Sequence, residues 1–285
     1  MASRAFRNPL GGVLRAQQFG LVLVILLLGA VLTLFAGSFT NAEGHRVNTF
    51  LNANTLLQTA SDASLFAIMA VGATLVIVSG GIDLSVGSIY ALSGVLTALA
   101  LRAWSADSAV LALALCVGIG LACGVTNGLM VSLLRVHPFI ITLGTMWIFR
   151  GIAFVASNAV SVPLPDAVVG AVKTTMGLER GLYPVPTLAM VAVTALGWLY
   201  LSKTAAGRHI YALGGNALAA RYSGLPIGRI QVGVYALSGL CAGIAAFVGS
   251  GYYGAASCND ANGYELFVIA SAVVGGASLS GGKGA

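Results

Sequence analysis

Long apolar runs with almost no charge restrict what this chain can fold into. Seven runs and a shorter eighth cover residues 19–39, 64–80, 88–103, 109–134, 138–157, 185–202, 230–253 and 265–279. A helix needs roughly 20 apolar residues to cross about 30 Å of hydrocarbon. Only 8% of the 285 residues are charged, whereas soluble domains carry about 25%. Most of the surface must therefore face lipid.

These runs predict an all-α, multi-pass membrane protein with about eight membrane segments in a single transmembrane domain, 1–285. A β-barrel would show segments of about ten residues with alternating polarity, and these runs are longer and continuously apolar. The 38 glycines suit close helix packing in a membrane. The net charge of +6 comes from basic residues scattered singly between the runs, which argues against nucleic acid as a partner. The four cysteines have no metal-ligand spacing, so we interpret them as small packing residues.

The distribution of Lys and Arg predicts the orientation. If the tail 1–18 is cytoplasmic, alternation places the 203–229 loop on the same side. The basic residues inside are then Arg4, Arg7, Arg15, Arg135, Lys203, Arg208, Arg221 and Arg229, and those outside are Arg46, Arg102, Lys173 and Arg180. Basic residues favour the cytoplasmic side of a membrane. We therefore expect a cytoplasmic N-terminus and an uncleaved first helix, whose apolar core is longer than that of a signal peptide.

A short helix is predicted within the 203–229 loop. Asn216 is a favourable N-cap, and the residues that follow, 217–223, favour helix. Gly224 suits the position after the last helical residue, and Pro226 blocks continuation. A helix of about two turns is not stable alone in water. It must pack on a partner surface, which is either its own membrane domain or another protein.

A glycine-rich break, SGGIDLSVGS, places one acid, Asp83, between two apolar runs at 79–88. Irregular backbone at membrane depth is tolerated only where it is buried in protein or lines a cavity. We expect Asp83 or Ser85 to cap the helix that begins near Val86. The alternative is that Asp83 binds a proton or cation, as in an ion-coupled secondary transporter.

A weak internal repeat is predicted from the break. GGIDLSVG at 80–87 is echoed by GGASLSGG at 275–282, and each follows an apolar segment that contains L-F-x-I. Transporters are often built from repeats whose helices break near the substrate. We therefore expect these segments to form a gate hinge. The expected gate and hinge residues are Gly80, Gly81, Asp83, Ser85, Gly87, Gly275 and Gly276.

Polar side chains within the runs are candidates for a substrate pathway, although such residues also bond between helices. The expected pathway residues are Asn127, Thr142, Thr145 and Tyr252. Arg150 also lies inside a run, where a charge is costly, and we expect it to form an ion pair with Glu265 or Asp62. The sequence shows no nucleophile–base set, metal-ligand spacing or phosphate-binding loop. No catalytic residue, metal or cofactor is expected in this chain, and an intramembrane enzyme is disfavoured.

Four ordered stretches resemble the permease subunits of ABC importers for monosaccharides, the ribose transporter family. They are VIVSGGIDLSVGS at 76–88, HPFIITLGTMWIFRGIAF at 137–154, GRHIYALGGNALAARYSGLPI at 207–227 and GYELFVIASAVVGGASLSGGKG at 263–284. The resemblance implies a multi-pass permease of a bacterial inner membrane that imports a ribose-like sugar. It also implies three protein partners: an ABC ATPase that uses ATP and Mg²⁺, a soluble sugar-binding protein, and a second permease copy.

In that family the short cytoplasmic helix is a coupling helix that sits in a cleft of the ATPase. The residues that would couple this chain to an ATPase are Gly215, Asn216, Ala217, Ala220, Arg221 and Gly224. Two departures stand out: Phe267 replaces an acid, and the family continues through about two more helices beyond Ala285. We therefore expect the C-terminal helices to be missing here. Permeases for branched-chain amino acids or a signalling sugar remain alternatives.

Overall fold

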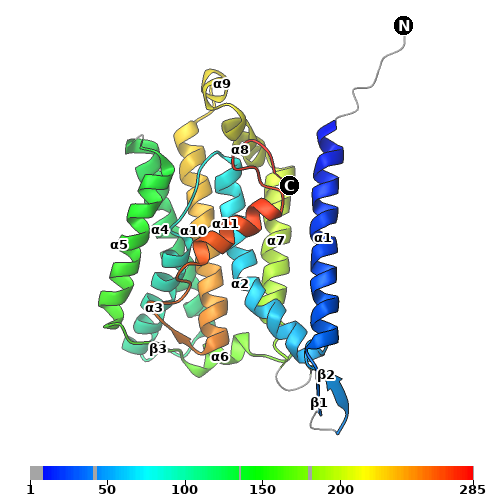
Figure 1. Cartoon of the computed structure of the whole chain (residues 1–285). Helices are drawn as coiled ribbons and strands as arrows, with labels where there is room; N and C mark the ends of the chain where they lie inside the picture. Colours follow the sequence, from blue (N-terminus) through cyan, green and yellow to red (C-terminus); the bar gives the residue numbers. More distant parts are fainter. Residues whose placement is uncertain (1–8, 41–43, 135, 179–181, 285) are drawn as a thin grey trace. The chain divides into compact units, whose positions relative to one another are not determined.

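The computed structural model describes four stretches of the chain, which are 9–40, 44–134, 136–178 and 182–284 (Figure 1). The chain divides into two compact units, Met1–Gln58 and Thr59–Ala285. Some of the basic residues on which the predicted orientation depends lie outside the described residues, namely Arg4, Arg7, Arg135 and Arg180.

The first unit holds one long helix and a small hairpin. Helix α1 runs over Pro9–Phe35, and strands β1 (Ser38–Thr40) and β2 (Arg46–Asn48) pair antiparallel. Asn48 fixes the chain after the hairpin, because its Nδ2 donates to the Thr33 carbonyl at 2.7 Å and its Oδ1 accepts from the N–H of Phe50 at 2.9 Å. The unit ends in the first residues of α2.

Six helices in the described part of the chain are long and apolar enough to cross a membrane. They are α2 (Ala53–Val78, which begins in the first unit), α3 (Val86–Ala103), α4 (Ala109–Leu134), α5 (Pro138–Ser157), α7 (Val185–Lys203) and α10 (Ile227–Tyr253). Each matches a predicted run, and α2 starts earlier because its polar first turns are helical too. The multi-pass, all-α fold is thus confirmed.

Of the two remaining predicted segments, only the last is shorter than a span. Helix α1 is continuous over the 27 residues Pro9–Phe35 and includes most of the predicted 19–39 run. Helix α11 covers only Tyr264–Val274, because the chain leaves the helix at Gly275. The expected 265–279 segment is therefore corrected to an 11-residue helix followed by irregular backbone. In Figure 1, α11 crosses the second unit obliquely in front of α10.

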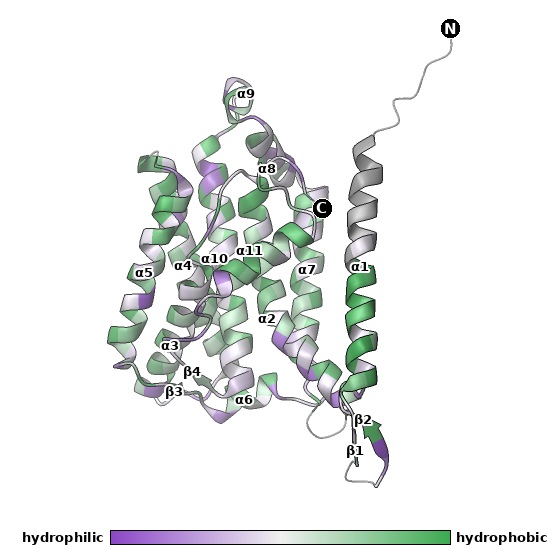
Figure 2. Ribbon diagram, viewed as in Figure 1, coloured by the Kyte–Doolittle hydropathy of each residue, from purple (hydrophilic) through white to green (hydrophobic). Residues whose placement is uncertain are grey.

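The core of the second unit is built from α2, α3 and α10, and α4 packs on α10 through small residues. Gly120 and Gly124 of α4 face Gly239 and Gly243 of α10. A Cβ on Gly239 would lie 2.9 Å from the Gly124 Cα, and one on Gly243 would lie 3.0 Å from the Val117 Cα. Small residues allow this close approach where no hydrophobic force drives helices together. Helix α7 is instead largely exposed, and its surface is apolar (Figure 2).

The two ends of the bundle differ in structure. Helices α8 (Ala205–Gly215) and α9 (Ala217–Tyr222) lie at one end, and helix α6 (Asp166–Val172) lies at the other (Figure 1). Strands β3 (Val162–Pro163) and β4 (Ala255–Ala256) pair antiparallel beside α6. Helices α8 and α9 of the 203–229 loop therefore lie at the opposite end of the second unit from α6.

Candidate functional site

The break between α2 and α3 encloses the carboxylate of Asp83, whose side chain is 2% exposed. Oδ1 accepts hydrogen bonds from the N–H of Ser85 at 2.9 Å and from its Oγ at 2.6 Å. Oδ2 accepts from the Ser238 Oγ of α10 at 2.8 Å. Burial raises the pKa of the Asp83 carboxyl, which lies between two spanning helices, whereas these hydrogen bonds lower it. Three donors thus hold a buried carboxyl group in place.

The same network extends to two further helices. Asn127 of α4 donates from Nδ2 to the Ser85 Oγ at 2.7 Å. The Ile82 carbonyl accepts from the Tyr235 hydroxyl of α10 at 3.3 Å and from the Thr142 hydroxyl of α5 at 3.2 Å. Among the described residues, the Asn127 Oδ1 has no hydrogen-bond partner. The break is therefore fastened to α4, α5 and α10.

This geometry corrects the predicted capping role of Asp83 and Ser85. Ser85 does occupy the N-cap position of α3, but its side chain makes no capping hydrogen bond. Its hydroxyl already bonds to Asp83 and Asn127, and among the described residues the Asp83 carboxylate accepts from no backbone N–H except that of Ser85. Both side chains serve contacts between helices instead.

The glycines of the expected hinge have three different roles. Gly80 and Gly276 adopt φ angles of +86° and +113°, a region that side chains disfavour. Gly81 and Gly87 are instead sites of close approach. A Cβ on Gly81 would lie 2.7 Å from the Tyr235 hydroxyl, and one on Gly87 would lie 3.0 Å from a Glu265 carboxylate oxygen. Gly275 ends α11.

Arg150 binds backbone carbonyls rather than the acids that the sequence suggested. Its side chain is 7% exposed, and Nη1 donates to the carbonyls of Cys258 at 2.7 Å and Asp260 at 2.6 Å. The expected ion pair with Glu265 or Asp62 is therefore corrected. Arg150 of α5 holds the loop that leads into α11, because charged donors form strong hydrogen bonds with carbonyl oxygens.

The predicted short helix exists as α9. The Asn216 Oδ1 accepts from the Ala219 N–H at 2.9 Å, and Gly224 adopts φ +78°. Leu218 and Tyr222 are 68% and 88% exposed, so α9 presents an apolar and aromatic face outward. Helix α8, which sequence reasoning did not separate from the loop, precedes α9 and is capped by Thr204, whose Oγ1 accepts from the Gly207 N–H at 3.0 Å.

The expected coupling residues fall into two groups. Five of the six are exposed, and these are Gly215, Asn216, Ala217, Arg221 and Gly224. Ala220 is 4% exposed and packs against the chain's own domain. Beside α9, a pocket of about 700 Å³ lies between the start of α5 and the start of α10, and its lining includes His137, Leu218, Arg221 and Gln231. The exposed face of α9 and this pocket are available to a partner.

The expected pathway residues lie in two different environments. Asn127, Thr142 and Thr145 are buried between helices, and the first two fasten the break. Tyr252 is half-buried, with its ring centroid 6.4 Å from that of Tyr183 and 5.3 Å from that of Tyr253. Substrate contact by these four side chains remains a prediction.

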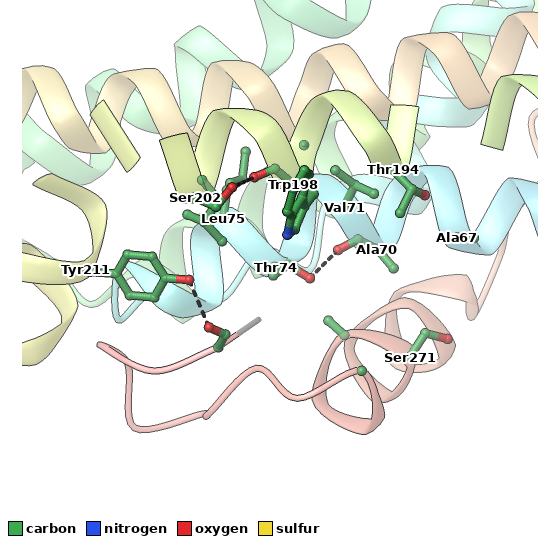
Figure 3. Close-up of a pocket in the computed structure, with 15 residues that line it drawn as sticks. Ala67, Ala70, Val71, Thr74, Leu75, Thr194, Trp198, Ser202, Tyr211 and Ser271 are labelled. Atoms are coloured by element: carbon green, nitrogen blue, oxygen red, sulfur yellow. Dashed lines mark hydrogen bonds between the residues drawn. The ribbon is translucent and has the colours of Figure 1, made fainter. Parts of the chain in front are cut away.

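A second pocket, of about 570 Å³, lies between α2, α7 and α11 (Figure 3). Trp198 of α7 lines it, together with the hydroxyl groups of Thr74, Tyr211 and Ser271. The Thr74 hydroxyl donates to the Ala70 carbonyl at 2.7 Å, and the Tyr211 hydroxyl donates to the Gly284 carbonyl at 2.8 Å. Sequence reasoning missed this pocket, because its walls come from segments far apart in the chain.

Comparison with known proteins places these features in a family. The family described as "Branched-chain amino acid transport system / permease component" matches residues 55–282. The chain belongs to this permease family. The match includes the Asp83 break, α8, α9 and the glycine-rich segment after α11, and it confirms the resemblance that the four stretches suggested.

Several curated permeases are similar over most of their length. The ribose import permease protein RbsC of Escherichia coli strain K12 is 38% identical over 269 residues, which cover 94% of this chain and 79% of the relative. The D-allose transport system permease protein AlsC of the same strain is 40% identical over 237 residues, which cover 82% of this chain and 71% of the relative. The autoinducer 2 import system permease protein LsrD of Yersinia enterocolitica is 34% identical over 267 residues, which cover 91% of this chain and 77% of the relative. No solved structure matches this chain.

Proposed function

We propose that this chain is the membrane subunit of an ATP-driven ABC importer that carries a ribose-like monosaccharide across the bacterial inner membrane. The similarity to ribose and D-allose permeases over most of the chain carries this proposal. Residues of the Asp83 break and of α9 lie within the same matched region. The chain supplies the membrane path, and substrate selection rests mainly with a soluble binding protein outside.

Energy would come from a separate ATPase. The sequence has no phosphate-binding loop, while α9 presents Leu218 and Tyr222 at one end of the bundle. An apolar helix face of this kind is typical of a surface that docks into a partner's groove. In this proposal α9 is the coupling helix, its end of the bundle is cytoplasmic, and the N-terminus lies on the same side. Two permease copies pair with two ATPase subunits.

The description of the family favours a second candidate, a permease for branched-chain amino acids. Reconstitution of the full-length gene product with its ATPase and binding protein in liposomes separates the two. We expect ATP-dependent uptake of radiolabelled ribose or allose that survives an ionophore. Uptake of leucine in place of the sugars would favour the second candidate, and uptake abolished by the ionophore without need of ATP would indicate ion coupling at Asp83.

A further inference from the structure

Glycines from three distant parts of the chain meet beside the start of α9. Gly80 follows α2, one pair ends α8 and one pair follows α11. We call this contact the glycine junction, and its members are Gly80, Gly214, Gly215, Gly281 and Gly282. Gly80 and the last pair belong to the two echoed sequences.

The segment after α11 lies directly against the end of α2. The N–H of Gly282 donates to the Val78 carbonyl at 2.8 Å, a carbonyl in the last turn of α2. A Cβ on Gly281 would lie 3.0 Å from the Gly80 Cα and 2.8 Å from the Gly214 carbonyl oxygen. Gly281 also adopts φ +75°. At Gly281 the backbone of the segment after α11 therefore touches the backbones at Gly80 and Gly214, with no side chain between them.

Helix α8 is joined to both other segments. A Cβ on Gly214 would overlap the Val78 carbonyl oxygen and lie 2.6 Å from the Gly282 nitrogen. About one turn earlier on α8, the Tyr211 hydroxyl donates to the Gly284 carbonyl at 2.8 Å, a bond drawn in Figure 3. The end of α8 therefore contacts both the last turn of α2 and the segment after α11.

The junction adjoins both α9 and Asp83 in the chain. Gly215 is followed by Asn216 and α9, while Gly80 lies shortly before Ile82, whose carbonyl binds the Tyr235 and Thr142 hydroxyls. Close-packed backbone leaves no flexible side chain to absorb a small displacement. These contacts form a continuous path from α9 to the break and, through the Ile82 carbonyl, to α5 and α10.

We propose that the glycine junction is the rigid connection that carries movement of α9 to the Asp83 break. Gly214 and Gly281 are then positioning residues for transport, acting through the break rather than on the substrate. This inference rests on the proposed function, in which an ATPase moves α9. A role in packing alone would lower assembly, ATP hydrolysis and uptake together, whereas a coupling role lowers uptake for each ATP hydrolysed.

The test uses the full-length permease with its ATPase and binding protein in liposomes, with ribose uptake and ATP hydrolysis measured on the same sample. Gly214→Ala forces α8 away from α2, and Tyr211→Phe removes only the hydroxyl that binds Gly284. Gly118→Ala on α4 is the matched control, because a Cβ there meets nothing within 4 Å. Mutations between coupled sites change coupling by roughly 0.5–2 kcal/mol, or about two- to thirtyfold.

We expect Gly214→Ala to lower uptake per ATP at least tenfold and Tyr211→Phe to lower it about threefold, with ATP hydrolysis retained and Gly118→Ala unchanged. If Gly214→Ala does not assemble, uptake per ATP in Tyr211→Phe tests the proposal by itself. Wild-type uptake per ATP in the variants that assemble would overturn the junction and leave the proposed function intact. A wild-type complex that hydrolyses ATP without moving sugar would contradict the proposed function itself.

Discussion

Ser238 of α10 donates a hydrogen bond to Oδ2 of Asp83 at 2.8 Å, although the two residues are 155 positions apart. The other carboxylate oxygen is occupied by the backbone and hydroxyl of Ser85. The glycine-rich break is therefore held by contacts from a distant helix and is more than a local turn. Its geometry depends on α10 staying in place.

Replacing Ser238 with alanine should destabilise the permease by about 2 kcal/mol, because a buried carboxyl oxygen loses a donor. Thermal unfolding of the purified protein in detergent measures this change. The matched control is Thr126→Ala on α4, whose exposed hydroxyl bonds only to its own helix at Ala122, and it should cost less than about 0.5 kcal/mol. Equal melting temperatures for the two variants would contradict the importance of the Ser238 bond.

Asp83→Asn should retain most of the ATP-driven sugar uptake. The amide keeps the size of the side chain, and the Ser238 hydroxyl can rotate to accept a hydrogen bond from it. Asp83→Leu should abolish uptake, because the Ser85 N–H and the Ser238 hydroxyl then lose their buried acceptor. Uptake in liposomes checks both variants. Complete loss in Asp83→Asn, with normal assembly, would instead support an ion-coupling role for the carboxylate.

Arg150→Gln should loosen the loop before α11 and cost about 3 kcal/mol, since strong hydrogen bonds to two carbonyls are lost. Hydrogen exchange should rise within 257–263 and remain unchanged in α4. Arg150→Lys keeps the charge but loses the second nitrogen of the fork, Nη2, which donates to the Ala261 carbonyl at 3.4 Å, so we expect an intermediate effect. Unaltered exchange of 257–263 in Arg150→Gln would show that the clamp does not hold the loop.

The sequence predicts the spanning helices and α9 well, because their signals are local. Apolar runs locate the spans, and Asn216 and Gly224 mark the ends of α9. The contacts of the break carry no such signal. Asp83 meets Ser238 across 155 positions, and Arg150 finds carbonyl oxygens that every residue possesses. The local sequence pattern identifies Asp83 and Arg150 as unusual, but it does not show which residues their side chains bind.

The echo between 80–87 and 275–282 shows the same limit. The pattern indicates related backbone breaks, and both segments do contain glycines at positive φ. The contact between Gly80 and Gly281 could not be predicted, because it depends on how α2 and α11 cross. The repeat itself remains a prediction.

Leu218→Glu on α9 should uncouple the permease from its ATPase without affecting folding. The side chain is 68% exposed, so a charge there costs the isolated permease little, whereas it would be buried in an ATPase groove. Recovery of the ATPase with the purified permease should fall at least about tenfold, a loss of about 1.4 kcal/mol in affinity. Leu178→Glu, exposed in the 158–184 segment, is the control. Equal recovery would mean that α9 does not bind the ATPase.

Cysteines placed at opposite ends of the bundle should react from opposite sides of the membrane. Gly215 and Gly170 are both exposed, and α8 and α6, which contain them, lie at different ends in Figure 1. The four native cysteines are buried, so their background labelling should be low. In intact cells an impermeant thiol reagent should modify Gly170→Cys, and Gly215→Cys should react only after the membrane is opened. The reverse pattern would invert the predicted topology and move α9 away from any cytoplasmic ATPase.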